Sequence, residues 1–200
     1  MNTIAGPDGK PRCRWCAAAP EFFHYHDTEW GFPVADEQRL FEKICLEGFQ
    51  SGLSWRTILA KRENFRTAFK DFDYVKVARY GARDVDKLLQ NEGIIRHRGK
   101  IEATINNAQR ACEMVEREGS LAAFVWRFEP EHPLTSPQTV STSAESVALS
   151  KALKKLGWKF VGPTTVYAFM QAMGLVNDHV EGCVTRTKVE RARKQFNRPG

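Results

Sequence analysis

One glutamate lies on the apolar face of a predicted helix, where its carboxylate could take part in binding or catalysis. Glu47 lies seven residues after Leu40 and three after Ile44, so it continues the face that these residues would bury. A carboxylate on such a face is costly to bury unless it is paired or used. Seven aromatic residues lie in the same part of the sequence: Trp15, Phe22, Phe23, Tyr25, Trp30, Phe49 and Trp55. A carboxylate within aromatic rings would suit a flat, cationic, hydrogen-bonding ligand such as an alkylated nucleobase.

The surroundings of Glu47 leave plainer interpretations open. A buried Glu47 could be paired to an arginine or lysine, and a helix that ends before Gly48 would leave the carboxylate exposed. The segment that follows, residues 48–53, is bounded by glycines. Leu53 in this loop could act as a wedge between base steps, or it could simply pack against the protein.

Cysteine and histidine residues form two groups whose types suit a metal ion. The candidates are Cys13, Cys16, His24, His26, His179 and Cys183. Sulfur and nitrogen ligands suit tetrahedral zinc, and the spacing of His179 and Cys183 predicts that both lie on one face of a helix. Six candidates compete for four positions, so spacing alone does not choose the ligands. Buried cysteines with incidental histidines remain an alternative, as does a redox pair of Cys13 and Cys16, although no βαβ pattern follows that pair.

A hairpin near the C-terminus has residues that could contact phosphate. Gly157 ends one expected helix, and Gly162 and Pro163 open the next with Thr164 behind them. Backbone N–H groups at such a helix start can approach a phosphate closely, and Lys159 adds positive charge. The alternative is an ordinary helical hairpin. A second basic run, residues 95–100, could contact phosphates or form a solvated face.

Helical periodicity dominates the elements that must position these residues. We expect helices over 36–50, 54–70, 83–90, 99–118, 121–128, 144–156 and 163–174. Ser54 is the expected N-cap of the second helix, and Thr142 with Glu145 predicts a capping box before the sixth. Residues 129–143, rich in Pro, Ser and Thr, predict an ordered surface loop. Strand alternation is almost absent, so we expect an all-α, bilobal protein.

Composition narrows the class of protein. The 200 residues contain 30 Lys and Arg against 24 Asp and Glu, and this net charge of +6 favours a polyanionic partner. Five cysteines, an odd number, argue against a secreted disulfide framework. Residues 1–10 lack a signal-peptide pattern, and the most apolar stretch, 160–176, is too short and too polar to span a bilayer. We therefore expect a soluble, cytoplasmic protein.

Four longer runs make the chain resemble the DNA-3-methyladenine glycosylase I family from about Cys13 to Cys183. They read YHDTEWG from residue 25, LEGFQSGLSW from 46, GIIRHRGKI from 93 and GLVNDH from 174. The resemblance implies a helix-hairpin-helix glycosylase fold in which one structural Zn²⁺ per chain joins the N- and C-terminal segments. We expect one glycosylase domain over residues 1–200. Residues 1–12 and the basic segment 188–200 lie outside the resemblance and are expected to be flexible tails.

The resemblance assigns roles to the candidate residues. It implies that Cys13, His26, His179 and Cys183 hold the zinc, which leaves out Cys16 and His24. It implies a base pocket of Glu47, Tyr25, Trp55, Trp15 and Trp30. Phe22 stands where some relatives carry tyrosine, so a hydroxyl contact is lost there. Glu47, rather than Asp178, is the expected catalytic residue, because the resembled subfamily does not rely on an aspartate after the hairpin. Residues expected to contact DNA are Leu53, Lys159, Gly162 and Thr164.

The implied reaction is base-excision repair of alkylated double-stranded DNA by a monomer, with free 3-methyladenine as the product. Methylation at N3 makes the nucleoside cationic, so its N-glycosidic bond is already weakened and little acid catalysis is needed. Stacking on Tyr25 and Trp55 would add cation–π attraction that neutral adenine lacks. No lyase step is expected, because no lysine in the sequence stands out as a desolvated nucleophile. The alternative is a catalytically silent, zinc-stabilised DNA-binding module that uses the same hairpin.

Overall fold

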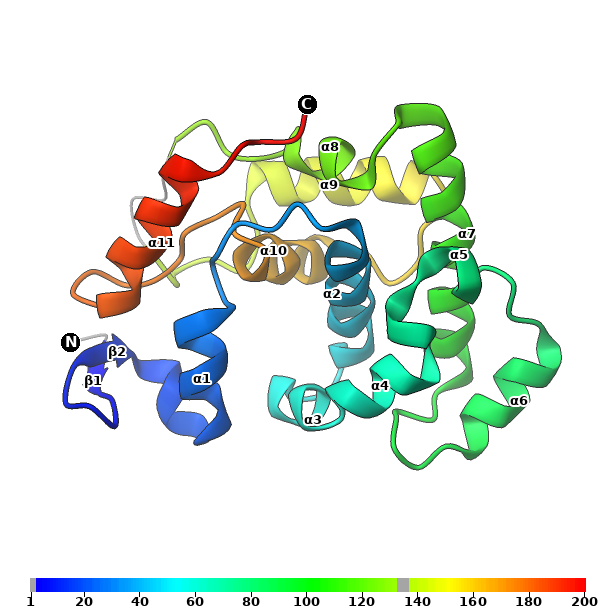
Figure 1. Cartoon of the computed structure of the whole chain (residues 1–200), viewed down its shortest axis with the longest axis horizontal. Helices are drawn as coiled ribbons and strands as arrows, with labels where there is room; N and C mark the ends of the chain where they lie inside the picture. Colours follow the sequence, from blue (N-terminus) through cyan, green and yellow to red (C-terminus); the bar gives the residue numbers. More distant parts are fainter. Residues whose placement is uncertain (1–2, 133–136) are drawn as a thin grey trace.

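The part of the chain that this computed structural model describes, residues 3–132 and 137–200, is mostly helical (Figure 1). Its α-helices are α1 (Glu21–Thr28), α2 (Glu37–Gln50), α3 (Trp55–Ala60), α4 (Arg62–Ala68), α5 (Tyr74–Val77), α6 (Ala82–Gln90), α7 (Arg98–Glu118), α8 (Leu121–Trp126), α9 (Ala144–Lys155), α10 (Pro163–Ala172) and α11 (Val184–Gln195). Strands β1 (Thr3–Ala5) and β2 (Pro11–Cys13) pair antiparallel with Thr3 opposite Cys13. Two 3₁₀ helices, η1 (Arg14–Ala18) and η2 (Lys70–Phe72), complete the described elements. The mostly helical class expected from the sequence is confirmed.

Helix α2 lies at the centre of the molecule, where it packs against α7, α8 and α10. It begins at Asp36, whose side chain accepts a hydrogen bond from the Arg39 amide at 2.8 Å. Every residue from Leu40 to Phe49 is buried. Burial on all sides forces the charged residues of this helix to find partners inside the protein.

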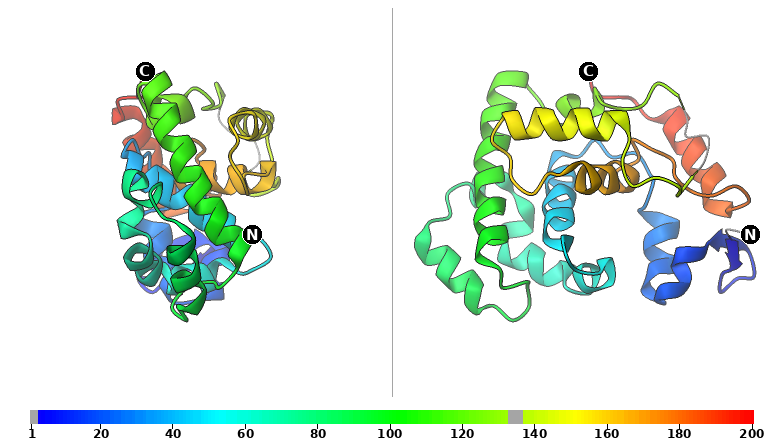
Figure 2. Two further views of the ribbon diagram at one scale, coloured as in Figure 1. Left: turned by 90° about the vertical axis from the view of Figure 1, so that its right-hand side faces the viewer. Right: turned by 180° about the vertical axis from the view of Figure 1, so that it is seen from behind.

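Two groups of elements flank α2 and α10 (Figure 2). The β hairpin, α1 and α11 lie on one side, and α4 to α7 lie on the other. Helices α9 and α10 pack against each other as the predicted hairpin. Gly157 ends α9 with a φ of +82°, and Pro163 occupies the first turn of α10 as expected.

The predicted helix over 54–70 is wrong in one respect, because it is two helices. Ser54 caps α3 as expected, but α3 ends at Ala60 and α4 begins at Arg62. The break at Lys61 redirects the chain, so that Trp55 packs on Tyr25 of α1 while Phe65 packs on Phe49 of α2, with ring centroids 5.4 and 4.6 Å apart. A single straight helix would not satisfy both contacts.

The capping box predicted for α9 is also displaced by one residue. Ser143, rather than Thr142, is the N-cap, and it exchanges hydrogen bonds with Ser146, rather than Glu145. In the loop expected over 129–143, residues 133–136 lie outside the described part of the chain.

Both segments expected to be flexible tails contain regular structure. At the N-terminus, Arg12 fastens the β hairpin by donating hydrogen bonds to Asp8 and Asp27. At the C-terminus, α11 buries Thr185 and Val189 on one face and packs against β2. None of the helices within residues 3–132 and 137–200 is long and apolar enough to cross a membrane.

Candidate functional site

A cavity of about 320 Å³ opens beside α1, α2, α3 and α10. Four aromatic side chains line it: Trp15, Tyr25, Trp30 and Trp55. Its polar lining consists of Glu47, Gln50, Gln138 and Gln171. This volume lies within the range of small-molecule sites. The structure thus brings together Glu47 and all four aromatic residues proposed for the pocket. Phe22 is outside the lining and packs edge-on against Trp15, at 5.6 Å between centroids.

Glu47 is 6% exposed and faces this cavity, and it also has a partner inside the protein. Lys43 Nζ lies 2.8 Å from Glu47 Oε1, donates a hydrogen bond to the Tyr25 hydroxyl at 2.9 Å, and lies 3.4 Å from the centroid of the Trp55 ring. Glu47 is therefore both paired to a lysine and part of the cavity lining, so the two interpretations of this residue are compatible. Sequence reasoning missed Lys43, although its position four residues before Glu47 on one helix was the available signal.

Burial changes the protonation of the groups around this pair. Burial lowers the pKa of Lys43, and the charge of Glu47 opposes that effect. Burial, followed by the negative charge of Glu47, raises the pKa of Tyr25 well above its ordinary value, so the phenol stays neutral. Lys43 is the desolvated lysine that the sequence interpretation did not expect. It lines a smaller space of about 20 Å³ beside Glu29 and Arg62, and is not among the residues that line the larger cavity.

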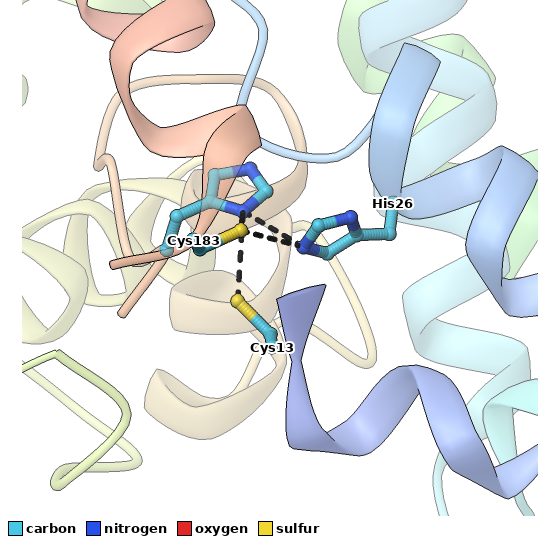
Figure 3. A group of neighbouring side chains, drawn as sticks. Cys13, His26 and Cys183 are labelled. Atoms are coloured by element: carbon cyan, nitrogen blue, oxygen red, sulfur yellow. Dashed lines mark hydrogen bonds between the residues drawn. The ribbon is translucent and has the colours of Figure 1, made fainter. Parts of the chain in front are cut away.

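A second cluster, of Cys13, His26, His179 and Cys183, is buried and can bind a metal ion. One ligand atom from each residue lies within 4.8 Å of the others. The separations are 3.0 Å for His26 Nε2 to His179 Nδ1, 3.5 Å for Cys183 Sγ to His26 Nε2, and 3.6 Å for Cys13 Sγ to His179 Nδ1. Zinc at ordinary bond lengths would space tetrahedral sulfur and nitrogen ligands by about 3.3–3.8 Å. Figure 3 shows Cys13, His26 and Cys183 pointing toward one another.

Both histidines of the cluster are oriented by a second hydrogen bond. The Nδ1 atom of His26 lies 2.7 Å from an oxygen of Asp27, and the Nε2 atom of His179 lies 3.0 Å from the Trp30 carbonyl oxygen. Such bonds leave the other ring nitrogen free for a metal. Because the ring of Trp30 lines the cavity, the cluster also supports one cavity wall.

The remaining metal candidates lie outside the cluster. Cys16 is buried but does not belong to the cluster, and burial raises the pKa of its thiol to about 12. His24 is exposed and contacts Thr28. The prediction that His179 and Cys183 share a helix face is wrong: residues 177–183 are not helical, a turn at Glu181 and Gly182 separates the two residues, and Cys183 is the N-cap of α11.

The residues expected to contact DNA lie on exposed loops and helix starts. Leu53 is 41% exposed, and Lys159 and Thr164 are exposed in the hairpin. Asn107 of α7 fixes the hairpin turn by hydrogen bonds of 2.8 and 2.9 Å to the backbone of Lys159. The neighbouring Phe160, with a φ of +55° and 40% exposure, was not singled out in the sequence.

Several charged side chains of the basic run 95–100 already have partners within the protein. Arg98 pairs with Asp86 at 3.0 Å and Arg96 approaches Glu92 at 3.7 Å. Lys100 is buried and donates hydrogen bonds to the carbonyl oxygens of Phe49 and Ser51, which fixes the loop that carries Leu53.

Asp178 is fully buried and acts on the cavity through other residues. Its carboxylate accepts hydrogen bonds from the Gln138 amide at 2.7 Å and from Gln171 Nε2 at 2.5 Å. Both glutamines line the cavity, whereas Asp178 does not. Burial raises its pKa. These contacts make Asp178 a support for the cavity lining.

Comparison with known proteins identifies the family. A family model for methyladenine glycosylase matches residues 15–187. The Escherichia coli protein DNA-3-methyladenine glycosylase 1 is 54% identical over 178 residues, which are 86% of this chain and 95% of that protein. A crystal structure of a 3-methyladenine DNA glycosylase I superimposes with a TM-score of 0.82 at 51% identity, covering 86% of this chain and 98% of the other. The Staphylococcus aureus enzyme, studied for its recognition of 3-methyladenine, gives a TM-score of 0.83 at 37% identity over 88% of this chain and 96% of its own. The chain therefore belongs to the methyladenine glycosylase family.

Proposed function

We propose that this chain hydrolyses the N-glycosidic bond of 3-methyladenine in alkylated double-stranded DNA and releases the free base. The observation that carries the proposal is the buried carboxylate of Glu47 in a cavity walled by four aromatic rings. The Staphylococcus aureus relative, whose structure concerns 3-methyladenine recognition, supports this choice of ligand.

The cavity suits a base that has been turned out of the double helix. Tyr25 and Trp55, whose ring centroids are 5.4 Å apart, offer π faces to a cationic ring. The Glu47 carboxylate accepts hydrogen bonds from the edge of the adenine and stabilises its positive charge. Trp15 and Trp30 complete the aromatic lining of the base pocket.

The reaction is a substitution at the sugar carbon that carries the base. The oxygen of a water molecule bonds to that carbon as the bond to the base nitrogen breaks. The electron pair of the broken bond neutralises the positive charge of the base, and the attacking water passes one proton to the surrounding water. Glu47 is the proposed catalytic residue, because it lies where it can both bind the base and orient the water. No covalent lyase intermediate is part of this mechanism.

The exposed loops provide the DNA contacts in this proposal. Leu53 fills the space left by the extruded base, and Lys159, Gly162 and Thr164 contact the phosphates at the start of α10. The Cys13, His26, His179 and Cys183 cluster holds Zn²⁺, which supplies structural cross-linking. We propose a cytoplasmic monomer that works as one glycosylase domain over residues 1–200.

The decisive experiment replaces the Glu47 carboxylate with an amide. Glu47→Gln keeps the shape of the side chain but removes its charge, so release of 3-methyladenine from methylated duplex DNA is expected to fall by about 10²-fold or more. Single-turnover release of the free base is the measurement, and circular dichroism reports the fold.

Glu42→Gln is the matched control, because Glu42 is a buried carboxylate of the same helix that pairs with Arg66 and lies outside the cavity lining. Wild-type release by Glu47→Gln would refute the role of Glu47. A wild-type protein that binds methylated DNA but releases no base would instead be the silent DNA-binding module.

A further inference from the structure

We infer that Lys43 is a positioning residue of the glycosylase site, which holds the Glu47 carboxylate ionised and directed at the cavity. The inference rests on the proposed function, because a cationic base gives that carboxylate its task. Lys43 acts through Glu47 and does not itself contact the base.

Three contacts fix the Lys43 ammonium in one place. It lies 2.8 Å from Glu47 Oε1 and 2.9 Å from the Tyr25 hydroxyl, and 3.4 Å from the centroid of the Trp55 ring. Lys43 is 5% exposed and Glu47 is 6% exposed. All three partners line the cavity, so a single ammonium joins three parts of its wall.

The position of Lys43 excludes direct attack on the substrate. Glu47 and Trp55 line the larger cavity, whereas Lys43 is not among its lining residues and lines the smaller space. Its ammonium is already engaged by a carboxylate, a phenol and an aromatic face. A nucleophilic lysine needs a free electron pair and access to the sugar carbon.

Most of the other charged groups around the pair are in ion pairs of their own. Glu29 beside α1 pairs with Arg62 of α4 at 2.6 Å. Glu42 of α2 pairs with Arg66 of α4, and Arg39 of α2 adds a positive charge at the smaller space. Helices α3 and α10 present the neutral side chains Trp55, Ala168 and Gln171 to the cavity. The ammonium of Lys43 is therefore the charge in direct contact with Glu47.

A buried carboxylate without a partner tends to take up a proton. A protonated Glu47 would lose the charge that attracts a cationic base and would present a hydroxyl in place of an acceptor. An opposite charge within about 4–6 Å typically favours the ionised form by about 1–3 pH units. Removing the Lys43 ammonium should therefore move the titration of Glu47 upward by that amount.

The test follows the Glu47 carboxyl directly in the full chain without DNA. Carbon-13 NMR of labelled glutamate carboxyl groups gives the titration midpoint, and Glu47→Gln identifies the Glu47 signal. In Lys43→Met the midpoint is expected about 1–3 pH units above that of the wild type. The acid limb of single-turnover 3-methyladenine release is expected to move by the same amount, and release at high pH to approach the wild-type rate.

Two further variants separate charge from structure. Lys43→Gln keeps a polar side chain without the charge and should show the same shift of the Glu47 midpoint. If Lys43→Met does not fold, Lys43→Gln takes its place in the test. Lys100→Met removes another buried lysine, which contacts the carbonyl oxygens of Phe49 and Ser51, and should leave the Glu47 midpoint in place.

Specific results would overturn the inference. An unchanged Glu47 midpoint in both Lys43 variants would do so, even if release falls uniformly at all pH values. Borohydride trapping of Lys43 on abasic DNA would show a nucleophile in place of a positioning residue. If the wild type releases no 3-methyladenine, the proposed function fails, but the NMR midpoint still decides whether Lys43 keeps Glu47 ionised.

Discussion

Trp30 takes part in the cavity through its ring and in the metal cluster through its backbone. Its carbonyl oxygen lies 3.0 Å from His179 Nε2, and its ring stacks on His26 with centroids 6.2 Å apart. Lys43 and Asp178 also make hydrogen bonds to cavity residues, although neither is among the residues that line the cavity. The wall is therefore held before a base enters, which reduces the ordering required on binding.

Glu29 and Arg62 line the same small space as Lys43, and changing Glu29 alone tests how much this ion pair stabilises the protein. Burial alone would raise its pKa, but hydrogen bonds and charge from Arg62 outweigh burial and lower it. A carboxyl whose pKa is lower in the folded state stabilises the protein above its unfolded value, near 4.5, and loses that contribution as the pH falls through the folded value.

Glu29→Gln should therefore lower the free energy of unfolding at neutral pH by about 1–3 kcal/mol. Its difference from the wild type should shrink as the pH is lowered below 4.5, the ordinary value for this carboxyl. Urea unfolding at neutral pH and at a pH below 4.5 is the measurement. The exposed Glu63, which pairs with the same kind of partner at the surface, provides a control in Glu63→Gln. An equal difference at both pH values would contradict the assignment of the effect to this ion pair.

At the scale of elements, the sequence predicted those helices whose boundaries depend on capping and on the spacing of apolar residues. The apolar spacing of residues 36–50 and the cap at Asp36 were sufficient to predict α2, which extends over Glu37–Gln50. The break at Lys61 has no local signal, because Ala60, Lys61 and Arg62 are good helix formers. Packing of Trp55 and Phe65 on different partners imposes it. Tertiary packing likewise orders α11, half of whose residues are charged.

For the site, the sequence likewise predicted the position of a residue on its helix but not the contacts between helices. Periodicity was sufficient to place Glu47 on the buried face of its helix. Choosing four of the six metal candidates required the family resemblance, because the two groups of candidates are far apart in the sequence. Lys43 has the right spacing from Glu47, but its contacts with Tyr25 and Trp55 depend on how α1, α2 and α3 meet.

The hairpin between α9 and α10 offers a test of DNA contact that spares the fold. Gly162 has a φ of −63°, and a Cβ added there would meet no atom within 4 Å. Gly162→Ala should therefore leave thermal stability unchanged. A phosphate close to this backbone would collide with the new methyl group, so affinity for duplex DNA should fall by about tenfold.

Gly119→Ala is the matched control for the hairpin. Gly119 ends α7 with a φ of +84°, so alanine is strained there and should lower stability by about 1 kcal/mol. We expect no change in DNA affinity. Fluorescence anisotropy with duplex DNA at fixed salt and thermal unfolding would measure both effects. Unaltered affinity in Gly162→Ala would indicate an ordinary hairpin.

At the scale of the whole molecule, the cluster of Cys13, His26, His179 and Cys183 joins β2, α1 and the segment before α11. We expect about one zinc ion per chain. Cys13→Ser should lose that ion and lower the melting temperature by about 10 °C or more, because a structural metal contributes directly to folding. Metal analysis and thermal unfolding are the measurements.

Cys16→Ser is the matched control for the metal site, since Cys16 is equally buried but outside the cluster. It should retain its zinc. Equal zinc content in Cys13→Ser and the wild type would refute the ligand assignment. Zinc loss in Cys13→Ser should also perturb Trp30, which makes the intrinsic fluorescence of the cavity a second readout.

The far separation of Cys13 and Cys183 has a consequence for how the protein is made. A ribosome produces Cys13, His26 and the cavity aromatics early, but His179 and the fourth residue of the cluster, Cys183, only after the hairpin has been synthesised. Synthesis must therefore pass Cys183 before all four residues that would fix α1 are present. Early exposure to metal cannot shorten this delay, and a chain halted before Cys183 would carry the aromatic residues of the cavity without a fixed wall.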